Sequence, residues 1–461
     1  MKLVRSFTVI PAAAVILANI IGTGIFVKTR VMTCNVGSPE MVLTVWVLAG
    51  LLSLAGAMLY AELSTMMPRA GGEFHFIGAS YGRKFAFLYG WTRTLASGAS
   101  TAAIAMLFVI FLNNLLGGGL SPLAMRVLPV VVIVVAMTLN FTSGRANGAV
   151  ATALTIGKVL LVLSIAIGAF IFADGSWLNF GESGAEGVCE GVPEGARLGF
   201  AGFGAAMLGA LWGYNGWNAL VMIGGEVKDP ARTLPRALIG GTMLVILLYV
   251  TINVAYFYVL TPLEIASVPE SSSVAYEVAV RFIGAGAAAV MSVGLMLSAY
   301  GTLHAGLLAS PRLPYALAKR GLLPHWFVRL SKRGVPVNAV LAMSLWAIIL
   351  TLTGTFDILT DIYVFVLWIF YGMTGAGLFI LRRTHPDADR PYRVWGYPIV
   401  PALFLLVTAY LLVNTLIATP LRALAGIGFI VSGLPVYAFF NRRVSEDDHV
   451  WLEVGPGDGV V

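Results

Sequence analysis

Twelve long apolar runs divide this chain of 461 residues. An α-helix needs about 20 apolar residues to cross the hydrocarbon layer of a membrane, and 58% of the chain is hydrophobic while only 11% is charged. That composition excludes a soluble domain. The sequence therefore predicts an integral membrane protein with twelve transmembrane helices at residues 8–34, 41–65, 84–113, 123–141, 149–172, 198–225, 237–260, 282–309, 336–355, 358–381, 396–418 and 423–441.

The runs also set the fold class and the orientation. None alternates apolar and polar positions over about ten residues, as a barrel strand does, so we expect an all-α fold. The first run follows only Lys2 and Arg5 and is too long for the core of a cleaved signal peptide. Most of the 29 basic residues lie in inner segments if both termini are cytoplasmic. We therefore predict a multi-pass plasma (inner) membrane protein, whose net charge of +7 reflects topology and not nucleic-acid binding.

Glycines interrupt two of the runs. The stretch "NIIGTGIF" (19–26) breaks the first span, and "LWGYNGWNAL" (211–220) breaks the sixth. Small residues also serve close helix packing, but paired breaks in two halves of a chain indicate a transporter site near the bilayer midplane. There a helix N-terminus attracts a carboxylate, and freed carbonyls accept from an ammonium. We expect a five-plus-five inverted repeat, with spans 1–5 in residues 1–172, an extracellular loop at 173–197, spans 6–10 in 198–381, two more spans in 396–441 and a cytoplasmic tail at 442–461.

Four longer motifs carry a family resemblance. They are "NIIGTGIFVKTR" (19–30), "YAELSTMMPRAGGEFHFI" (60–77), "GWNALVMIGGEVKDPARTLPRAL" (216–238) and "RPYRVWGYPIVP" (390–401). With them the chain resembles the amino acid, polyamine and organocation (APC) transporter superfamily, and within it the L-type amino-acid transporter branch and its bacterial relatives. The resemblance implies a LeuT-like fold in which helices 1 and 6 are broken, and transport by alternating access.

The resemblance also implies a substrate site at the two breaks. The first break would bind the substrate carboxylate and offer carbonyls to its amino group, and Trp212 would close over the substrate as a lid, unless it is simply a packing or interfacial aromatic. Asn215 departs from the expected small residue, which predicts a narrower or more polar pocket. The implied substrate-binding residues are Ile20, Ile21, Gly22, Thr23, Gly24, Trp212, Gly213 and Asn215.

Lys158 lies inside the fifth span, where an unpaired ammonium is costly. It should therefore face the bundle interior, although a lysine there can also extend toward the cytoplasmic surface. The resemblance implies that Lys158 takes the place of a sodium ion, bridging the first break to Ser298 and Thr302 of the eighth span. Sodium-independent transport would follow, while proton coupling through a desolvated lysine stays open.

Arg93 is the second charge inside a span. It either lines the substrate pathway or the cytoplasmic vestibule, where it would disfavour cationic substrates, or it extends to the membrane surface or pairs with a loop. Other charges flank the second and sixth spans and are interpreted as an inner-gate and loop network that forms in one state and breaks in the other. These residues are Glu62, Arg69, Glu73, Glu226 and Arg236.

The two cysteines, Cys34 and Cys189, both fall on the predicted outer side. They either form a disulfide or stay unpaired in separate loops, because spacing alone does not fix their distance. Relatives that pair with a single-span glycoprotein use a cysteine between spans three and four, and residues 113–124 contain none. The resemblance therefore implies a protein that works without a disulfide-linked glycoprotein partner.

Other classes of function fit poorly. The sequence has no metal-ligand motif, no nucleophile with a base and no phosphate loop, so we expect neither an enzyme nor a cofactor. Paired breaks suit an occluding site better than the continuous pore of a channel. We predict a secondary active transporter of neutral L-amino acids, working as a sodium-independent exchanger or facilitator. The alternatives are proton-coupled symport and exchange of cationic amino acids or polyamines.

Overall fold

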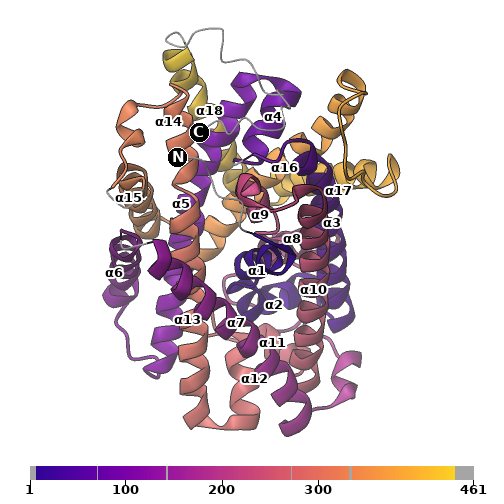
Figure 1. Ribbon diagram of the computed structural model, residues 1–461. Helices are drawn as coiled ribbons and strands as arrows, with labels where there is room; N and C mark the ends of the chain where they lie inside the picture. Colours follow the sequence, from indigo (N-terminus) through magenta and orange to yellow (C-terminus); the bar gives the residue numbers. More distant parts are fainter. Residues whose placement is uncertain (1–6, 70, 142–143, 271, 332–334, 442–461) are drawn as a thin grey trace.

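The computed structural model describes residues 7–69, 71–141, 144–270, 272–331 and 335–441 (Figure 1). Within these ranges the chain is helical and forms no β-strand, which confirms the all-α prediction. The predicted tail at 442–461, and Lys2 and Arg5, lie outside the described residues. The membrane-length helices are α3 (Pro39–Met66), α5 (Arg83–Leu115), α6 (Pro122–Asn140), α7 (Gly144–Phe172), α10 (Pro230–Val259), α13 (Ala285–Ala309), α16 (Phe356–Thr384), α17 (Ile399–Ala418) and α18 (Pro420–Asn441).

The predicted first and sixth spans are each interrupted where their glycines fall. Helix α1 (Val9–Ile20) ends before Gly22, and α2 (Gly24–Val36) continues at an angle of 47°. Helix α8 (Gly199–Gly213) gives way to a turn at 214–218, followed by the short helix α9 (Ala219–Met222). Each interruption therefore opens the backbone inside a predicted span.

Helix length alone does not establish the number of spans. Nine helices in the described residues are long and apolar enough to cross a membrane, or ten if α1 and α2 count as one bent span. The two remaining predicted spans contain the shorter apolar helices α8, of 15 residues, and α15 (Val337–Thr353), of 17 residues. The count of twelve and the inverted repeat thus stay predictions.

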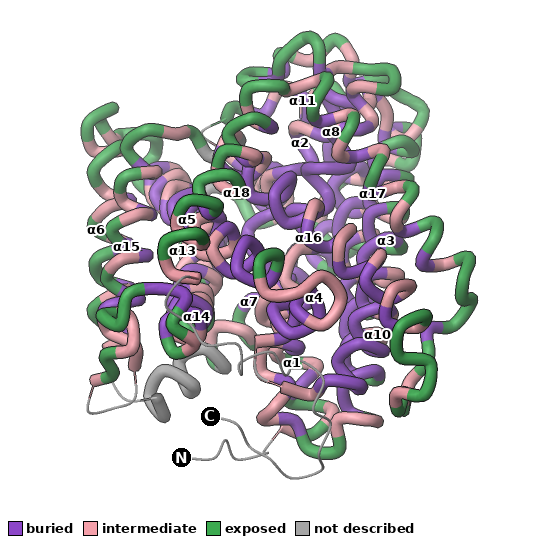
Figure 2. The backbone as a smooth tube through the Cα atoms, turned by 90° about the horizontal axis from the view of Figure 1, so that it is seen from above, coloured by how far each residue is buried: buried purple, intermediate pink, exposed green. Residues whose placement is uncertain are grey.

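Helix α5 lies at the centre of one half of the bundle, where it packs against α13, α15 and α16. On the other side α10 packs against α1 and α3, and α2 packs against α8. Buried backbone fills the interior between these groups, and exposed segments lie around the rim (Figure 2). The broken helices α1, α2 and α8 are thereby held between two sets of longer helices.

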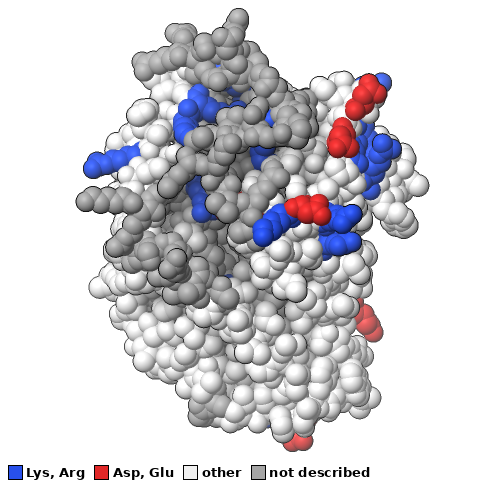
Figure 3. Space-filling model, in the orientation of Figure 1, with Lys and Arg blue, Asp and Glu red and all other residues white. Residues whose placement is uncertain are grey.

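The two ends of the bundle carry different short elements. Helices α4 (Glu73–Tyr81) and α14 (Arg312–Lys319) lie at the upper end in Figure 1, together with η4 (His325–Val328). Helices α11 (Pro262–Ser267) and α12 (Val274–Ile283) lie at the lower end. Figure 3 shows that the visible Lys and Arg side chains gather in the upper half of this face, while the lower half is almost free of them. We call the upper end of the bundle the α4 end and the lower end the α11 end.

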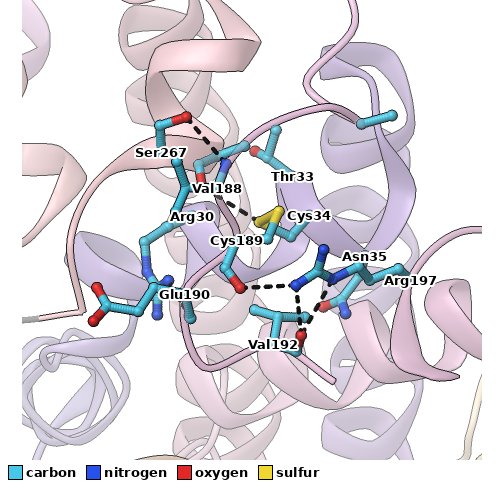
Figure 4. Close-up of a disulfide and its surroundings, with 12 residues drawn as sticks. Arg30, Thr33, Cys34, Asn35, Val188, Cys189, Glu190, Val192, Arg197 and Ser267 are labelled. Carbon is cyan, nitrogen blue, oxygen red and sulfur yellow. Dashed lines mark hydrogen bonds between the residues drawn. A yellow bond between two sulfur atoms is a disulfide. The ribbon is translucent and has the colours of Figure 1, made fainter. Parts of the chain in front are cut away.

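A disulfide joins Cys34, near the end of α2, to Cys189 in the loop 173–197, with their Cα atoms 5.7 Å apart (Figure 4). Of the two alternatives for these cysteines, the bonded one is therefore present. The Cys189 amide donates to Ala266 O of α11, and Arg197 donates to the carbonyls of Cys189 and Val192. The loop contains η1 (Trp177–Gly181) and η2 (Glu194–Ala196). The disulfide and these hydrogen bonds therefore attach the loop to α2 and α11.

Candidate functional site

The two helix breaks lie directly against each other, and two glycines make this possible. A Cβ atom on Gly24 would lie 2.8 Å from the Trp212 ring and from the Cα atom of Gly213. Gly216 has a φ of +121°, and a Cβ there would lie 2.6 Å from the Asn19 carbonyl oxygen. A side chain at either position would push the two breaks apart, so the glycines allow a shared site.

The first break presents unpaired groups at the start of α2. Thr23 is buried, and its hydroxyl has no hydrogen-bond partner among the described residues. A buried hydroxyl without a partner is unusual in a native protein and calls for a ligand or a water molecule. It lies at a helix N-terminus, where backbone N–H groups and the helix dipole favour an anion. Gly22, Thr23 and Gly24 together thus form a suitable carboxylate site.

Tyr249 of α10 connects the two breaks and was not among the residues predicted from the sequence. Its hydroxyl lies 2.8 Å from the Ile20 carbonyl and 3.0 Å from the Gly213 carbonyl, two of the groups predicted to face the substrate ammonium. Each carbonyl keeps a second lone pair for a ligand. A tyrosine in the middle of an apolar run needs a hydrogen-bond partner for its hydroxyl. That requirement is the sequence signal that could have identified Tyr249. The neighbouring Ile21 is buried beside this contact.

Trp212 ends α8 at the closest approach of the two breaks. It is 8% exposed, and the Lys28 ammonium of α2 lies 5.7 Å from the centre of its ring. Trp212 therefore packs where a lid would be, although its movement over a substrate stays a prediction.

Asn215 occupies the turn between α8 and α9. The sequence predicts a role for its carbonyl, but its side chain makes the contacts. Its Nδ2 donates to the Tyr363 hydroxyl at 2.8 Å, and its Oδ1 accepts from the Tyr371 hydroxyl at 3.1 Å. Both tyrosines belong to α16. Asn215 is therefore surrounded by polar groups, while a narrower or more polar substrate pocket stays a prediction.

Lys158 of α7 is 3% exposed and bridges two other helices. Its Nζ donates to Thr302 Oγ1 of α13 at 2.6 Å and to the Ala18 carbonyl of α1 at 3.3 Å. Gly301 leaves room for the lysine, because a Cβ there would lie 3.2 Å from Lys158 Cε. The second expected partner is different. Ser298 Oγ is buried without a hydrogen-bond partner among the described residues, and only the Ser298 carbonyl takes part, by accepting from Thr302.

Arg93 of α5 points toward the second break. Its Nη1 donates to the Tyr363 hydroxyl at 2.8 Å, and its guanidinium lies 5.5 Å from the centre of the Tyr363 ring. It is close enough to Glu73 for the two charges to attract. Unlike Lys158, Arg93 is only partly buried. Whether Arg93 lines the substrate pathway stays a prediction.

The predicted inner-gate and loop network divides into separate clusters. Glu62 is buried within α3 itself, not in the loop after it, and accepts from Arg382 at 2.6 Å and from the Val394 amide at 2.7 Å. Its carboxylate also pairs with Arg390 at 3.5 Å. A buried carboxylate that lost these partners would be strongly destabilising, so this cluster holds the 385–398 connection against α3.

The other members of that network lie apart from Glu62. Glu73 is buried and accepts from the Tyr89 hydroxyl at 2.9 Å and from Asn218 of the second break. Glu226 ends η3 (Gly224–Glu226), and its backbone carbonyl accepts from the Phe7 amide at 3.2 Å. Arg236 is exposed on α10. Among these residues, Glu73 contacts the second break through Asn218. The described residues contain no cluster of three His, Cys, Asp or Glu side chains that could hold a metal ion.

Known proteins resemble this chain over most of its length. The family model described as amino acid permease matches residues 7–440. The serine/threonine exchanger SteT of Bacillus subtilis is 31% identical over 439 residues, which cover 94% of this chain and 96% of the relative. The b(0,+)-type amino acid transporter 1 of Mus musculus is 31% identical over 96% of this chain and 91% of its own. Large neutral amino acids transporter small subunit 2 of Homo sapiens is 30% identical over 94% of this chain and 80% of the relative.

Proposed function

Because the chain belongs to the amino acid permease family, we propose for it a specific mode of amino-acid transport, the sodium-independent exchange of neutral L-amino acids by alternating access. Transport of amino acids is the activity of this family, so the chain is a membrane transporter and not an enzyme. The family match also confirms the resemblance that its motifs carry. The substrate range, the coupling and the roles of individual residues are the proposal.

The contacts of Lys158 carry the sodium-independent part. In sodium-coupled carriers, carbonyls at an unwound helix coordinate the ion. Here an ammonium already binds the Ala18 carbonyl of α1 and the Thr302 hydroxyl of α13. A fixed charge at that place holds the two helices together as an ion would, and leaves those oxygens unavailable to sodium. We therefore assign Lys158 and Thr302 to this bridge and leave Ser298 out of it.

The substrate would lie across the two breaks. We assign its carboxylate to the start of α2, where the Thr23 hydroxyl lacks a partner among the described residues. Its ammonium would face the carbonyls of Ile20 and Ile21 on one side and those of Gly213 and Asn215 on the other. Trp212, which touches both breaks, would close over it. The charge of Arg93 disfavours cationic amino acids and polyamines at the same place.

One relative is named a serine/threonine exchanger, which supports both the neutral substrate and the exchange mode. Proton-coupled symport is the second candidate, and a specific observation favours it. No carboxylate pairs with Lys158 among the described residues, so the lysine has no fixed anion to hold its proton. A lysine that releases its proton in one state of the cycle would couple transport to pH.

The distribution of basic residues bears on the orientation in the membrane, and the two cysteines bear on the partners of the protein. The basic α4 end in Figure 3 supports a cytoplasmic location for that end in the plasma membrane. The chain has two cysteines, and they are bonded to each other. No thiol is left for a disulfide-linked glycoprotein, so we propose that the protein works without one. Maleimide should label the unreduced, denatured protein at no position and the reduced protein at two, whereas labelling before reduction would contradict this.

The test of the transport proposal uses the purified full-length protein in liposomes loaded with unlabelled amino acids. Uptake of labelled alanine, leucine and arginine is followed with sodium, with choline in its place, and with an imposed proton gradient. We expect uptake of a neutral amino acid that requires internal substrate and is unchanged in choline. A requirement for sodium would contradict the role of Lys158. Uptake into empty liposomes driven by the proton gradient would select the second candidate.

A further inference from the structure

Four polar side chains from three parts of the fold meet beside the second break, and the exchange mechanism does not account for their arrangement. Arg93 comes from α5, Asn215 from the turn after α8, and Tyr363 and Tyr371 from α16. We call these four residues the tyrosine cluster. Three hydrogen bonds connect them in a chain.

The hydroxyl of Tyr363 is left with one unused donor. It accepts from Arg93 Nη1 and from Asn215 Nδ2, each at 2.8 Å, and a tyrosine hydroxyl has no further good acceptor position. Its own proton must then point away from both groups. Among the described residues, the hydrogen bonds of this hydroxyl are the two that it accepts. Asn215, in contrast, is satisfied, because its Oδ1 already accepts from Tyr371.

Two members of the cluster keep part of their surface exposed. Arg93 and Asn215 are both partly exposed, although α5 and α16 are membrane-length helices with buried centres. Tyr371, one layer behind them, is only 1% exposed. Arg93 and Asn215 therefore face an accessible region at the break where the α-carboxylate and α-ammonium of a substrate are proposed to bind.

The charges of the cluster restrict what enters that region. Arg93 repels an ammonium or a guanidinium. Glu73 lies nearby, where its carboxylate oxygens accept from Tyr89 and Asn218. The cluster adds a single directed O–H donor on Tyr363, which suits an uncharged oxygen.

We propose that the tyrosine cluster is the side-chain subsite of this transporter and selects neutral amino acids whose side chain carries an oxygen acceptor, a hydroxyl or an amide carbonyl. This inference rests on the proposed function, because it requires an amino acid bound across the two breaks next to Asn215. Tyr363 donates to the side-chain oxygen, while Arg93 and Asn215 orient its hydroxyl. An aliphatic isostere leaves the donor without a partner and binds less well.

The experiment compares isosteric competitors in exchange by the full-length protein in liposomes. Threonine and valine differ only by a hydroxyl in place of a methyl group, and glutamine and methionine form a second pair of similar length. In the wild-type protein we expect the oxygen-bearing member of at least one pair to inhibit exchange about fivefold more strongly. In Tyr363→Phe the ratio should fall to near one, because the donor is gone.

A matched control is a tyrosine of α4 that contacts the same helix, α16. The hydroxyl of Tyr81 donates to the Met373 carbonyl of α16 at 2.7 Å, outside the tyrosine cluster. Tyr81→Phe therefore removes a hydroxyl contact to α16 and should keep the wild-type ratio. If Tyr363→Phe does not fold, Asn215→Ala serves instead, since it removes one of the two donors that orient Tyr363 and should also lower the ratio.

The outcomes separate this inference from the function on which it rests. If no amino acid is exchanged, the proposed function fails and the inference with it. If exchange is intact but both wild-type ratios are near one, or neither cluster variant changes them, the subsite is wrong and the function stands. If aspartate or glutamate competes better than its amide, the charge of Arg93 decides selectivity, and the neutral substrate class is overturned.

Discussion

Lys158 and Arg93 are both basic residues within long apolar helices, but their surroundings differ. Lys158 is almost completely buried, and its ammonium binds one backbone carbonyl and one hydroxyl. Arg93 is partly exposed, lies over an aromatic ring and has Glu73 nearby. The first residue connects helices α1, α7 and α13. The second connects α5 to α16 and, through Tyr363, to the second break.

This difference reflects the chemistry of the two side chains. An ammonium is a compact point charge with three donors, which suits the oxygens that would otherwise coordinate an ion. A guanidinium is planar, stacks on aromatic rings and keeps several donors in one plane. A lysine can therefore replace a cation in the interior, while an arginine shapes the polarity of a pocket wall. Two charges of equal sign within one bundle can thus serve coupling in one place and selectivity in the other.

The largest effect is expected from Lys158→Met, which keeps the length of the side chain and removes its charge. The Ala18 carbonyl and the Thr302 hydroxyl would lose their donor, and each unsatisfied buried group costs about 1–3 kcal/mol. We expect the rate of amino-acid exchange in liposomes to fall more than about 100-fold.

Its control is the thermal unfolding of the purified variant, which distinguishes lost transport from lost protein. Exchange within about twofold of the wild type would show that Lys158 is only a buried side chain. If added sodium restored exchange by the variant, the comparison of the Lys158 ammonium with a bound sodium ion would be strengthened.

Arg93→Met should act on selectivity rather than on rate. Without the guanidinium, a cationic side chain no longer meets a like charge. Two such charges about 6 Å apart repel by roughly 2 kcal/mol in a partly solvated site. We expect competition by arginine or lysine for uptake of a neutral amino acid to improve roughly 20-fold, measured as an inhibition constant.

The matched variant is Arg93→Lys, which keeps the charge and loses the planar contact with Tyr363. It should continue to exclude cationic amino acids. Equal competition by arginine in the wild type and in both variants would remove Arg93 from the substrate pathway and end the contrast with Lys158.

The sequence could predict the features that depend on local pattern. Apolar runs indicated the long helices, and the glycines of the first and sixth runs marked where the backbone opens. A lysine inside an apolar run had to find polar groups, because membrane hydrocarbon offers none. For the same reason Arg93 is conspicuous in the sequence alone.

Other features depend on contacts between residues far apart in the chain, which no local pattern contains. Cys34 and Cys189 are separated by 155 residues and meet because α2 and the loop 173–197 pack at the α11 end. Tyr249 and Tyr363 could be noted as tyrosines within spans, but their partners Ile20 and Asn215 are set by helix packing. The partners of Glu62 are set in the same way, since it pairs with arginines more than 300 residues away in the chain.

Thr302 and Ser298 offer the finest test of the comparison, because the sequence placed both beside Lys158 and the structure separates them. They lie one helical turn apart on α13, and only Thr302 Oγ1 accepts from the ammonium, at 2.6 Å. Thr302→Val removes a hydrogen bond to a charged group, which is worth about 1.5–3 kcal/mol, and should slow exchange about tenfold. Ser298→Ala removes a hydroxyl without a partner among the described residues and should leave the rate within about twofold. If the two variants behaved in the opposite way, Lys158 would use Ser298 during transport. The bridge would then resemble a mobile ion site more than the fixed contact that distinguishes it from Arg93.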